Sequence, residues 1–198
     1  MNRYPVNPAM TNASAEFSFL KGRVILVDGE FFCRYHGIRQ LADRLASYLA
    51  ANQMHLCLAK SAEAEIAARI DDPSTDPSYR RSLQSGLQFI RGFEVAGLIK
   101  PLGSENDSTA ETFLKYIMLN RTSREIVVLT QQKWIFEDVS LLNSLRSVKA
   151  PAVQVRRLNN DGFLEPFQDN PHAAAASAEF PRSAAQPVSE ALIRLGLA

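Results

Sequence analysis

The stretch Arg23–Phe32, which reads RVILVDGEFF, decides the fold predicted for this chain. Val24 to Val27 form an apolar run without alternation, which is typical of a strand buried on both faces of a parallel sheet. The run stops at Asp28, and Gly29 allows the chain to turn sharply there. Ligands of such sheets bind beyond the carboxyl ends of the strands, where the strand order reverses. Asp28 is therefore expected at a ligand site or, alternatively, as a cap of the turn or of the next helix.

The composition is that of an ordinary globular protein. The chain has 198 residues, 46% of them hydrophobic, which is enough for one domain with a sizeable core. The formal net charge is +1, so a nucleic-acid or membrane site would have to be a local patch. No apolar run is long enough to cross a membrane, and the N-terminus lacks the apolar segment of a signal peptide. Cys33 and Cys57 lack metal-ligand spacing and are predicted to be buried thiols of a reducing compartment. We therefore expect a cytoplasmic protein without a membrane partner.

Apolar runs and helical patterns alternate from 23 to 158 and predict an α/β domain with a mostly parallel sheet, spanning residues 22–168. Residues 1–21 are expected to form a loose leader that packs through Phe17, Phe19 and Leu20. The composition shifts to Ala, Pro and Ser from about residue 169, which predicts a disordered linker. The last residues, VSEALIRLGLA, form a short amphipathic segment able to dock onto a protein partner or onto the domain itself. Strands are expected at 23–28, 55–59, 98–102 and 126–129, with an edge strand around Val153 and Val155.

Several acidic residues have a structural explanation beside a functional one. Glu63 and Glu65 lie near the start of the helix that follows Ser61, where acids stabilise the positive end of the helix dipole. Ser108 and Glu111 have the spacing of a capping box, in which each side chain satisfies a free backbone amide. The capping box explains Glu111 without catalysis, but it does not explain Asp107.

Basic and aromatic residues cluster in the segment after the loop 71–77. Arg80, Arg81 and Arg91 lie in or beside a predicted helix, with Tyr79 and Phe89 interleaved. Such a cluster can contact a phosphate backbone. The alternative is a solvated helical face, which is the commoner meaning of a charged stretch.

Three oxygen-bearing residues are expected at one edge of the sheet. Asp28 ends the first strand, Asp107 precedes the helix before the fourth strand, and Thr130 ends the fourth strand. If the first and fourth strands are neighbours where the strand order reverses, these side chains meet in one cleft. Clustered carboxylates repel one another unless a cation holds them, and oxygen ligands suit Mg²⁺ or Mn²⁺. Such an ion activates water for an in-line displacement at phosphorus.

The segments VILVDGEFF and NDSTAETFLKYIMLNRTSREIVVLTQQKWIFEDVSLLNSL resemble the PIN-like nucleases, and DGE resembles the NYN branch of that superfamily. The resemblance covers residues 22–158 and rests on short motifs and on the order of the elements. It implies a three-layer α/β/α fold, a divalent metal and RNA as substrate. Asp28 matches the family's first-strand acid, Asp107 its acid at the later helix, and Glu65 its mid-chain glutamate, with Glu63 as a rival. Asp28, Glu65 and Asp107 are therefore the expected catalytic and metal-binding residues.

The chain departs from the family where the fourth strand ends. It reads Thr130-Gln131-Gln132-Lys133-Trp134 where the family has Thr/Ser-x-Asp, so Gln132 stands in the place of an aspartate. Gln132 keeps an oxygen but loses the charge, while Lys133 adds a positive charge that can replace part of a metal or contact a phosphate. The expected substrate-binding residues are Thr130, Gln132, Lys133, Arg80 and Arg81.

Three functions are compatible with these residues. The first is a metal-dependent ribonuclease that hydrolyses RNA phosphodiesters at the carboxylate cluster with Mg²⁺ or Mn²⁺. The second is a PIN-like module that binds RNA or a protein partner without cleavage, which Gln132 and Lys133 favour. The third is a phosphatase of the haloacid dehalogenase type, but that family needs a second Asp where this chain has Glu30. A homodimer is also compatible with the sequence.

Overall fold

The computed structural model describes residues 15–145 and 150–167. The expectations for the first part of the leader and for the Ala/Pro-rich segment with its amphipathic end concern residues outside these ranges. The described end of the leader forms the short 3-10 helix η1 (Ser18–Leu20). Phe17 and Leu20 are fully buried in the domain core, and the ring of Phe17 lies 5.3 Å from that of Tyr48.

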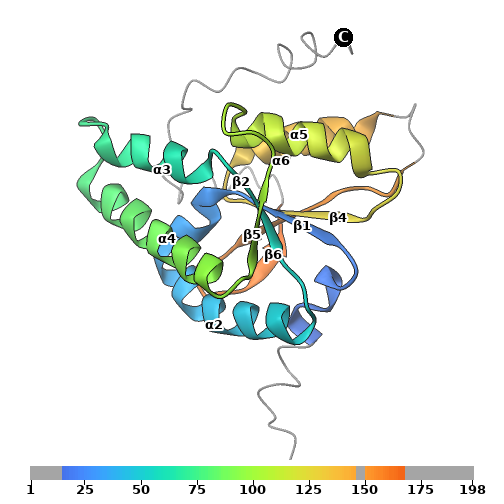
Figure 1. Cartoon of the computed structure of the whole chain (residues 1–198), viewed down its shortest axis with the longest axis horizontal. Coiled ribbons are helices and arrows are strands. Elements are labelled where there is room, and N and C mark those ends of the chain that lie inside the picture. Colours follow the sequence, from blue (N-terminus) through green and yellow to red (C-terminus); the bar gives the residue numbers. More distant parts are fainter. Residues whose placement is uncertain (1–14, 146–149, 168–198) are drawn as a thin grey trace, which may run out of the picture.

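The described strands form one sheet in the order β3-β2-β1-β4-β5-β6 (Figure 1). They are β1 (Val24–Val27), β2 (Leu56–Ala59), β3 (Ile99–Leu102), β4 (Ile126–Leu129), β5 (Gln154–Leu158) and β6 (Leu164–Pro166). β1 to β5 are parallel, and only β6 runs antiparallel to its neighbour. The mostly parallel sheet confirms the predicted class. The predicted edge position of the fifth strand is wrong, because the turn after Leu158 forms a hairpin that adds β6 outside it.

Helices cover both faces of the sheet (Figure 1). α2 (Tyr35–Ala51), α3 (Ala62–Asp71) and α4 (Pro77–Val95) pack on one face, and α5 (Thr109–Asn120) and α6 (Lys133–Ser144) pack on the other. Successive side chains of a strand point to opposite faces. Ile25 and Val27 accordingly join the core under α2, α3 and α4, whereas Leu26 joins the core under α5 and α6. This arrangement confirms the expected three-layer α/β fold.

The strand order reverses between β1 and β4. From β1 the chain proceeds to β2 and β3 on one side, then crosses through α5 to β4 on the other side of β1. Val27 lies level with Leu129 in the parallel pairing of the two strands. Asp28 and Thr130, the residues that follow, therefore lie side by side at the carboxyl edge of the sheet. The two strands are thus neighbours, which is the condition under which these residues were expected to meet.

The 3-10 helix η2 (Gly29–Cys33) follows β1 directly and is entirely buried. The backbone of Gly29 does not adopt a positive φ, so the turn itself does not require glycine. A Cβ at Gly29 would instead come within 2.8 Å of the Cδ1 of Ile66, and at Gly86 it would overlap the Sγ of Cys33. The two glycines thus let α3 and α4 approach η2. The first residues of η2 line the cavity described below.

The two cysteines differ in exposure. Cys33 is buried as predicted, whereas Cys57 is only half-buried, and neither forms a disulfide. Burial raises the pKa of both thiols, so both are protonated at neutral pH. Across the ranges that the structure describes, no helix is long and apolar enough to cross a membrane.

Candidate functional site

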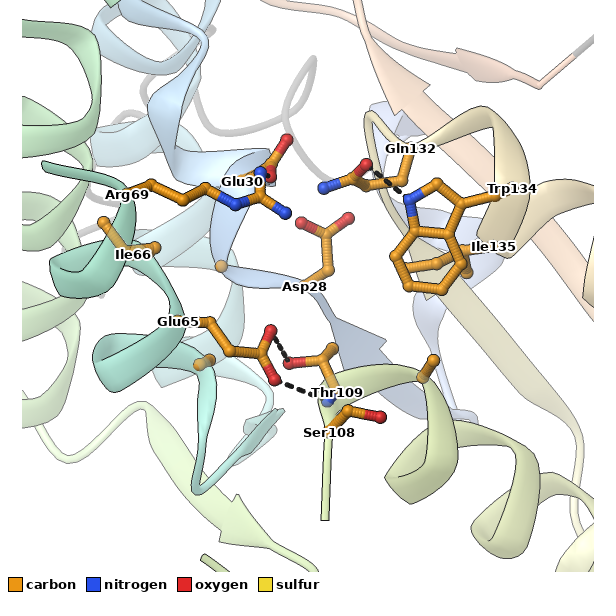
Figure 2. A pocket seen from close by; sticks show the side chains of 13 residues that line it. Asp28, Glu30, Glu65, Ile66, Arg69, Ser108, Thr109, Gln132, Trp134 and Ile135 are labelled. Carbon is orange, nitrogen blue, oxygen red and sulfur yellow. Dashed lines mark hydrogen bonds and ion pairs between the residues drawn. The ribbon is translucent and has the colours of Figure 1, made fainter. Parts of the chain in front are cut away.

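A cavity of about 300 Å³ lies beyond the carboxyl ends of β1 and β4 (Figure 2). It is enclosed by the end of β1 with η2, by one face of α3, by the first turn of α5 and by the start of α6. This is where parallel sheets bind their ligands. The lining residues are Asp28, Gly29, Glu30, Ala62, Glu65, Ile66, Arg69, Ser108, Thr109, Ala110, Gln132, Trp134 and Ile135.

Asp28 is both a cap of η2 and part of the cavity wall. Its side chain is 2% exposed; Oδ1 accepts a hydrogen bond from the N–H of Phe31 at 3.0 Å, and Oδ2 accepts one from the N–H of Gln131 at 3.3 Å. The Thr130 hydroxyl hydrogen-bonds the same carboxylate. Burial raises the pKa of Asp28 to about 6, although these hydrogen bonds and the charge of Arg69 act in the opposite direction. Asp28 therefore changes its charge close to neutral pH.

Glu65 extends from α3 toward the first turn of α5. Its carboxylate accepts hydrogen bonds from the N–H of Thr109 at 2.8 Å and from the Thr109 hydroxyl at 3.0 Å (Figure 2). It also accepts one from the Ser61 hydroxyl at 2.9 Å. Glu63, the alternative glutamate, is not part of the cavity wall and pairs with Arg91 at 3.5 Å. The structure therefore places Glu65, rather than Glu63, at the cavity.

Gln132 lies across the cavity from Glu65, at the start of α6. Its Oε1 accepts a hydrogen bond from the indole N–H of Trp134 at 2.7 Å, and its backbone N–H donates to the Thr130 hydroxyl at 2.9 Å. Figure 2 shows the amide of Gln132 directed toward the region above Asp28, beside the half-buried ring of Trp134. The neutral amide of Gln132 thus faces the cavity.

Glu30 and Arg69 form an ion pair in the wall of the cavity (Figure 2). The side chain of Glu30 is 8% exposed and that of Arg69 is 20% exposed. Arg69 also donates to the Tyr79 hydroxyl at 3.3 Å. The pair places one positive and one negative charge within the cavity wall, and the Arg69 side chain is partly exposed.

Four of the expected site residues lie elsewhere. The carboxylate of Asp107 pairs with Lys115 at 2.7 Å, and Lys133 is exposed and pairs with Glu137 at 3.5 Å; neither lines the cavity. Arg80 donates to the carbonyls of Asp72 and Thr75, and so holds the loop before α4. Exposed Arg81 donates to the carbonyl of Pro77 at 3.4 Å. Asp28, Glu65 and Gln132 line the cavity, whereas Thr130 is fully buried and contacts Gln132 without lining it. Asp107, Lys133, Arg80 and Arg81 are not part of the cavity wall.

The donor set does not fit the expected Mg²⁺ or Mn²⁺ ion. Within residues 15–145 and 150–167, no group of three or more His, Cys, Asp or Glu side chains is arranged to hold a metal. Glu65 is engaged by Thr109, Glu30 by Arg69, and Asp107 by Lys115. Hard divalent cations require several oxygen ligands at once. Asp28 alone does not supply them.

Arg69 and Trp134 line the cavity although the sequence did not predict them as site residues. Ala62, Glu65, Ile66 and Arg69 are spaced i, i+3, i+4 and i+7, so they share one face of α3. All four line the cavity. Because Glu65 is a predicted site residue, the spacing of four residues along the helix is the signal in the sequence that identifies Arg69 as its neighbour on the same face. The spacing of Trp134 from Gln132 carries no comparable signal.

Comparisons with known proteins do not assign the chain to a family. No protein-family model matches the sequence, and no curated protein matches it. Among solved structures, a PIN domain endonuclease, Utp24, superposes with a TM-score of 0.41 and 12% identity, covering 75% of this chain and 95% of that chain. Similarity this low supports no statement about the chemistry of the cavity.

Proposed function

We propose that this chain is a PIN-like module that binds single-stranded RNA in the cavity between α3, α5 and α6 without cleaving it. The proposal rests on one observation: the acidic side chains at the cavity are already engaged by other residues. Glu65 is held by Thr109, Glu30 is held by Arg69, and the position of a further acid is occupied by Gln132. A cavity built in this way offers recognition groups but no cluster of free carboxylates.

The cavity wall suits one nucleotide of an RNA chain. RNA-binding proteins recognise single strands by stacking bases on aromatic rings, by hydrogen bonds to base edges and by cations near the phosphates. Trp134 supplies the ring, Gln132 the amide and Arg69 the cation. A cavity of about 300 Å³ is at the small end of ligand pockets and matches a single nucleotide better than a longer segment.

The charge distribution sets the expected orientation of that nucleotide. Asp28 at the cavity floor becomes anionic as the pH rises through its pKa of about 6, so it repels a phosphate at neutral pH. A base carries N–H donors and is the better neighbour for a carboxylate. We therefore expect the base to lie toward Asp28 and Gln132 and the phosphate to lie toward Arg69.

The second candidate is a ribonuclease that assembles its metal site only when RNA is bound. It is favoured by one observation: Asp28 and Glu65 come from different elements yet line the same cavity. This reading requires Glu65 to exchange its hydrogen bonds with Thr109 for other ligands. No step of it follows from the contacts that the structure shows.

RNA binding and RNA cleavage can be measured on the same full-length protein. Trp134 is the single tryptophan of the chain, so its fluorescence reports on this cavity alone. Titration with a short unlabelled uridine or adenosine oligonucleotide is expected to change the Trp134 fluorescence saturably. End-labelled RNA of the same sequence is expected to stay intact in Mg²⁺ or Mn²⁺.

Matched variants make the test specific. Trp134→Leu is expected to weaken RNA binding, measured by the anisotropy of a labelled strand, because it removes the stacking surface. Arg39→Ala is the control, since this exposed residue of α2 contacts Tyr35 and not the cavity. Equal affinities for wild type and Trp134→Leu would refute the proposed site. Metal-dependent cleavage that disappears in Asp28→Asn would establish the second candidate instead.

A further inference from the structure

A second hollow lies at the opposite, amino-terminal edge of the sheet. It has a volume of about 370 Å³ and is lined by the segment before and into β1, the segment before and into β2, strand β3, and Tyr116 and Arg124 from α5 and the turn after it. Strands of four residues are about 13 Å long. This basic groove, named here for the residues Arg23, His55, Lys100 and Arg124, shares no lining residue with the cavity around Asp28 and is separate from it.

The groove follows from the uneven covering of the two faces of the sheet. Three α-helices pack on one face of the described sheet, whereas α5 and α6 alone pack on the other (Figure 1). On that second face, Cys57 of β2 lies level with Lys100 of β3 in the parallel pairing. Cys57 is half-buried and Lys100 is exposed, so the outer strands are only partly covered there.

The charges of the groove are all of one sign. No Asp or Glu is among its lining residues. Arg23 is neutralised by Glu125, which its Nε contacts at 2.7 Å. Lys100 and Arg124 are exposed, and neither has a carboxylate partner within the described part of the chain. Two like charges left unpaired in one hollow attract an anion to it.

One wall of the groove is aromatic and apolar. The half-buried ring of Tyr116 lies there with Met54 and Leu102. Tyr116 and Arg124 line the same groove. Burial and the nearby Cys57 raise the pKa of Tyr116, while the charge of Arg124 lowers it. An aromatic surface beside unpaired cations is the combination that protein sites for nucleotides use.

We propose that the basic groove is a second binding site, for a phosphate-bearing ligand of the nucleotide class. The phosphate lies between Lys100 and Arg124, and the base or sugar lies against Tyr116 and Leu102. The phosphate belongs either to a free mononucleotide or to the backbone of an RNA strand. The groove is independent of the function proposed for the cavity around Asp28.

Cys57 provides a direct reporter of this groove. The chain contains two cysteines, and Cys33 is 7% exposed in the core, so a thiol reagent modifies Cys57 first in the folded protein. Pyrophosphate, uridine monophosphate and a short uridine oligonucleotide are each tested for protection of Cys57 from alkylation, read by mass spectrometry. Saturable protection is the expected result. Similar affinities for the mononucleotide and the oligonucleotide assign the ligand to free nucleotides, whereas a much tighter oligonucleotide assigns it to RNA.

Charge-reversal variants distinguish phosphate binding in the groove from an effect of the net charge of the protein. Lys100→Glu combined with Arg124→Glu is expected to weaken protection by about tenfold or more, because two phosphate contacts become repulsive. Arg39→Glu, a single reversal on the opposite face, and Trp134→Leu in the first cavity are expected to leave protection unchanged. Absence of protection by all three ligands would overturn the proposal. An equal loss in Arg39→Glu would do the same, since it would show an effect of net charge alone.

Discussion

The carboxylate of Glu65 accepts hydrogen bonds from both the backbone N–H and the hydroxyl of Thr109, at 2.8 Å and 3.0 Å. The two residues are 44 positions apart, and their contact joins α3 to the first residue of α5. The first N–H groups of a helix have no partner within it, and a carboxylate there also complements the helix dipole. Glu65 therefore acts as a cap of a helix other than its own and fixes one side of the cavity.

Removal of this contact is expected to destabilise the fold. Glu65→Ala leaves the buried N–H and hydroxyl of Thr109 without their acceptor, which should lower the free energy of unfolding by about 1–3 kcal/mol. The control is Glu63→Ala in the same helix, whose partner Arg91 is exposed, with an expected loss of about 0–1 kcal/mol. Urea denaturation measures both. Equal losses for the two variants would contradict the capping role.

The pKa of Asp28 predicts how stability depends on pH. Burial raises this pKa from 3.8 to about 6, so the folded state favours the protonated carboxyl. Between these values the folded protein binds more protons than the unfolded chain, and stability contributed by Asp28 falls as the pH rises. The loss is complete above about pH 6 and amounts to roughly 3 kcal/mol at most. Below pH 3.8 the contribution is fully present.

Asp28→Asn isolates this contribution because asparagine stays neutral. The free energy of unfolding of the variant minus that of wild type is expected to rise between about pH 4 and about pH 6 and then to level off. The gain is reduced by the N–H of Gln131, which loses a carboxylate acceptor. Denaturant titrations at a series of pH values measure the difference. A difference that does not vary with pH would show that Asp28 has an ordinary pKa.

The central strands and the position of Asp28 were predictable because they depend on local patterns. VILV and IVVL are continuous apolar runs, and both became strands buried between two helical layers. The capping box of Ser108 and Glu111 also formed as its spacing predicted. Strand β6 was missed because it has only three residues, ends in Pro166 and depends on a hairpin with β5.

The composition of the cavity was less predictable because it depends on side-chain direction. Asp107 lies one residue outside the cap of α5, so no helical period fixes where its carboxylate points, and it turns to Lys115. Lys133 and Gln132 are neighbours in sequence, yet Gln132 faces the cavity and Lys133 faces Glu137. Single residues at loop ends take directions that only tertiary packing decides.

Two glycines of α4 are expected to respond oppositely to substitution by alanine. A Cβ at Gly86 would overlap Cys33 of η2, so Gly86→Ala should push α4 away from η2 and lower stability by about 1–3 kcal/mol. A Cβ at Gly92 meets no atom within 4 Å, so Gly92→Ala should stabilise the helix by about 1 kcal/mol. Thermal and urea denaturation test both. Stabilisation by Gly86→Ala would show that the packing between α4 and η2 is loose.

The last prediction concerns Gln132, whose amide faces the cavity. Gln132→Asp adds a carboxylate on the same side of the cavity as Trp134, and two carboxylates that share a site attract a divalent cation. We expect the variant to bind Mn²⁺ more tightly than wild type in a calorimetric titration. The indole N–H of Trp134 loses its acceptor at the same time, so the tryptophan fluorescence should change even without metal.

Gln131→Asp is the matched control for this change. Its side-chain amide donates to the carbonyl of Leu158 and is not part of the cavity wall, so a carboxylate there should leave Mn²⁺ affinity unchanged. The double variant Asp28→Asn/Gln132→Asp should lose the gain in Mn²⁺ affinity, because the carboxylate of Asp28 is no longer present to share the ion. RNA cleavage by Gln132→Asp but not by wild type would show that the missing acid alone silences the site. Equal Mn²⁺ affinities for Gln132→Asp and Gln131→Asp would mean that position 132 does not contribute a ligand to this cavity.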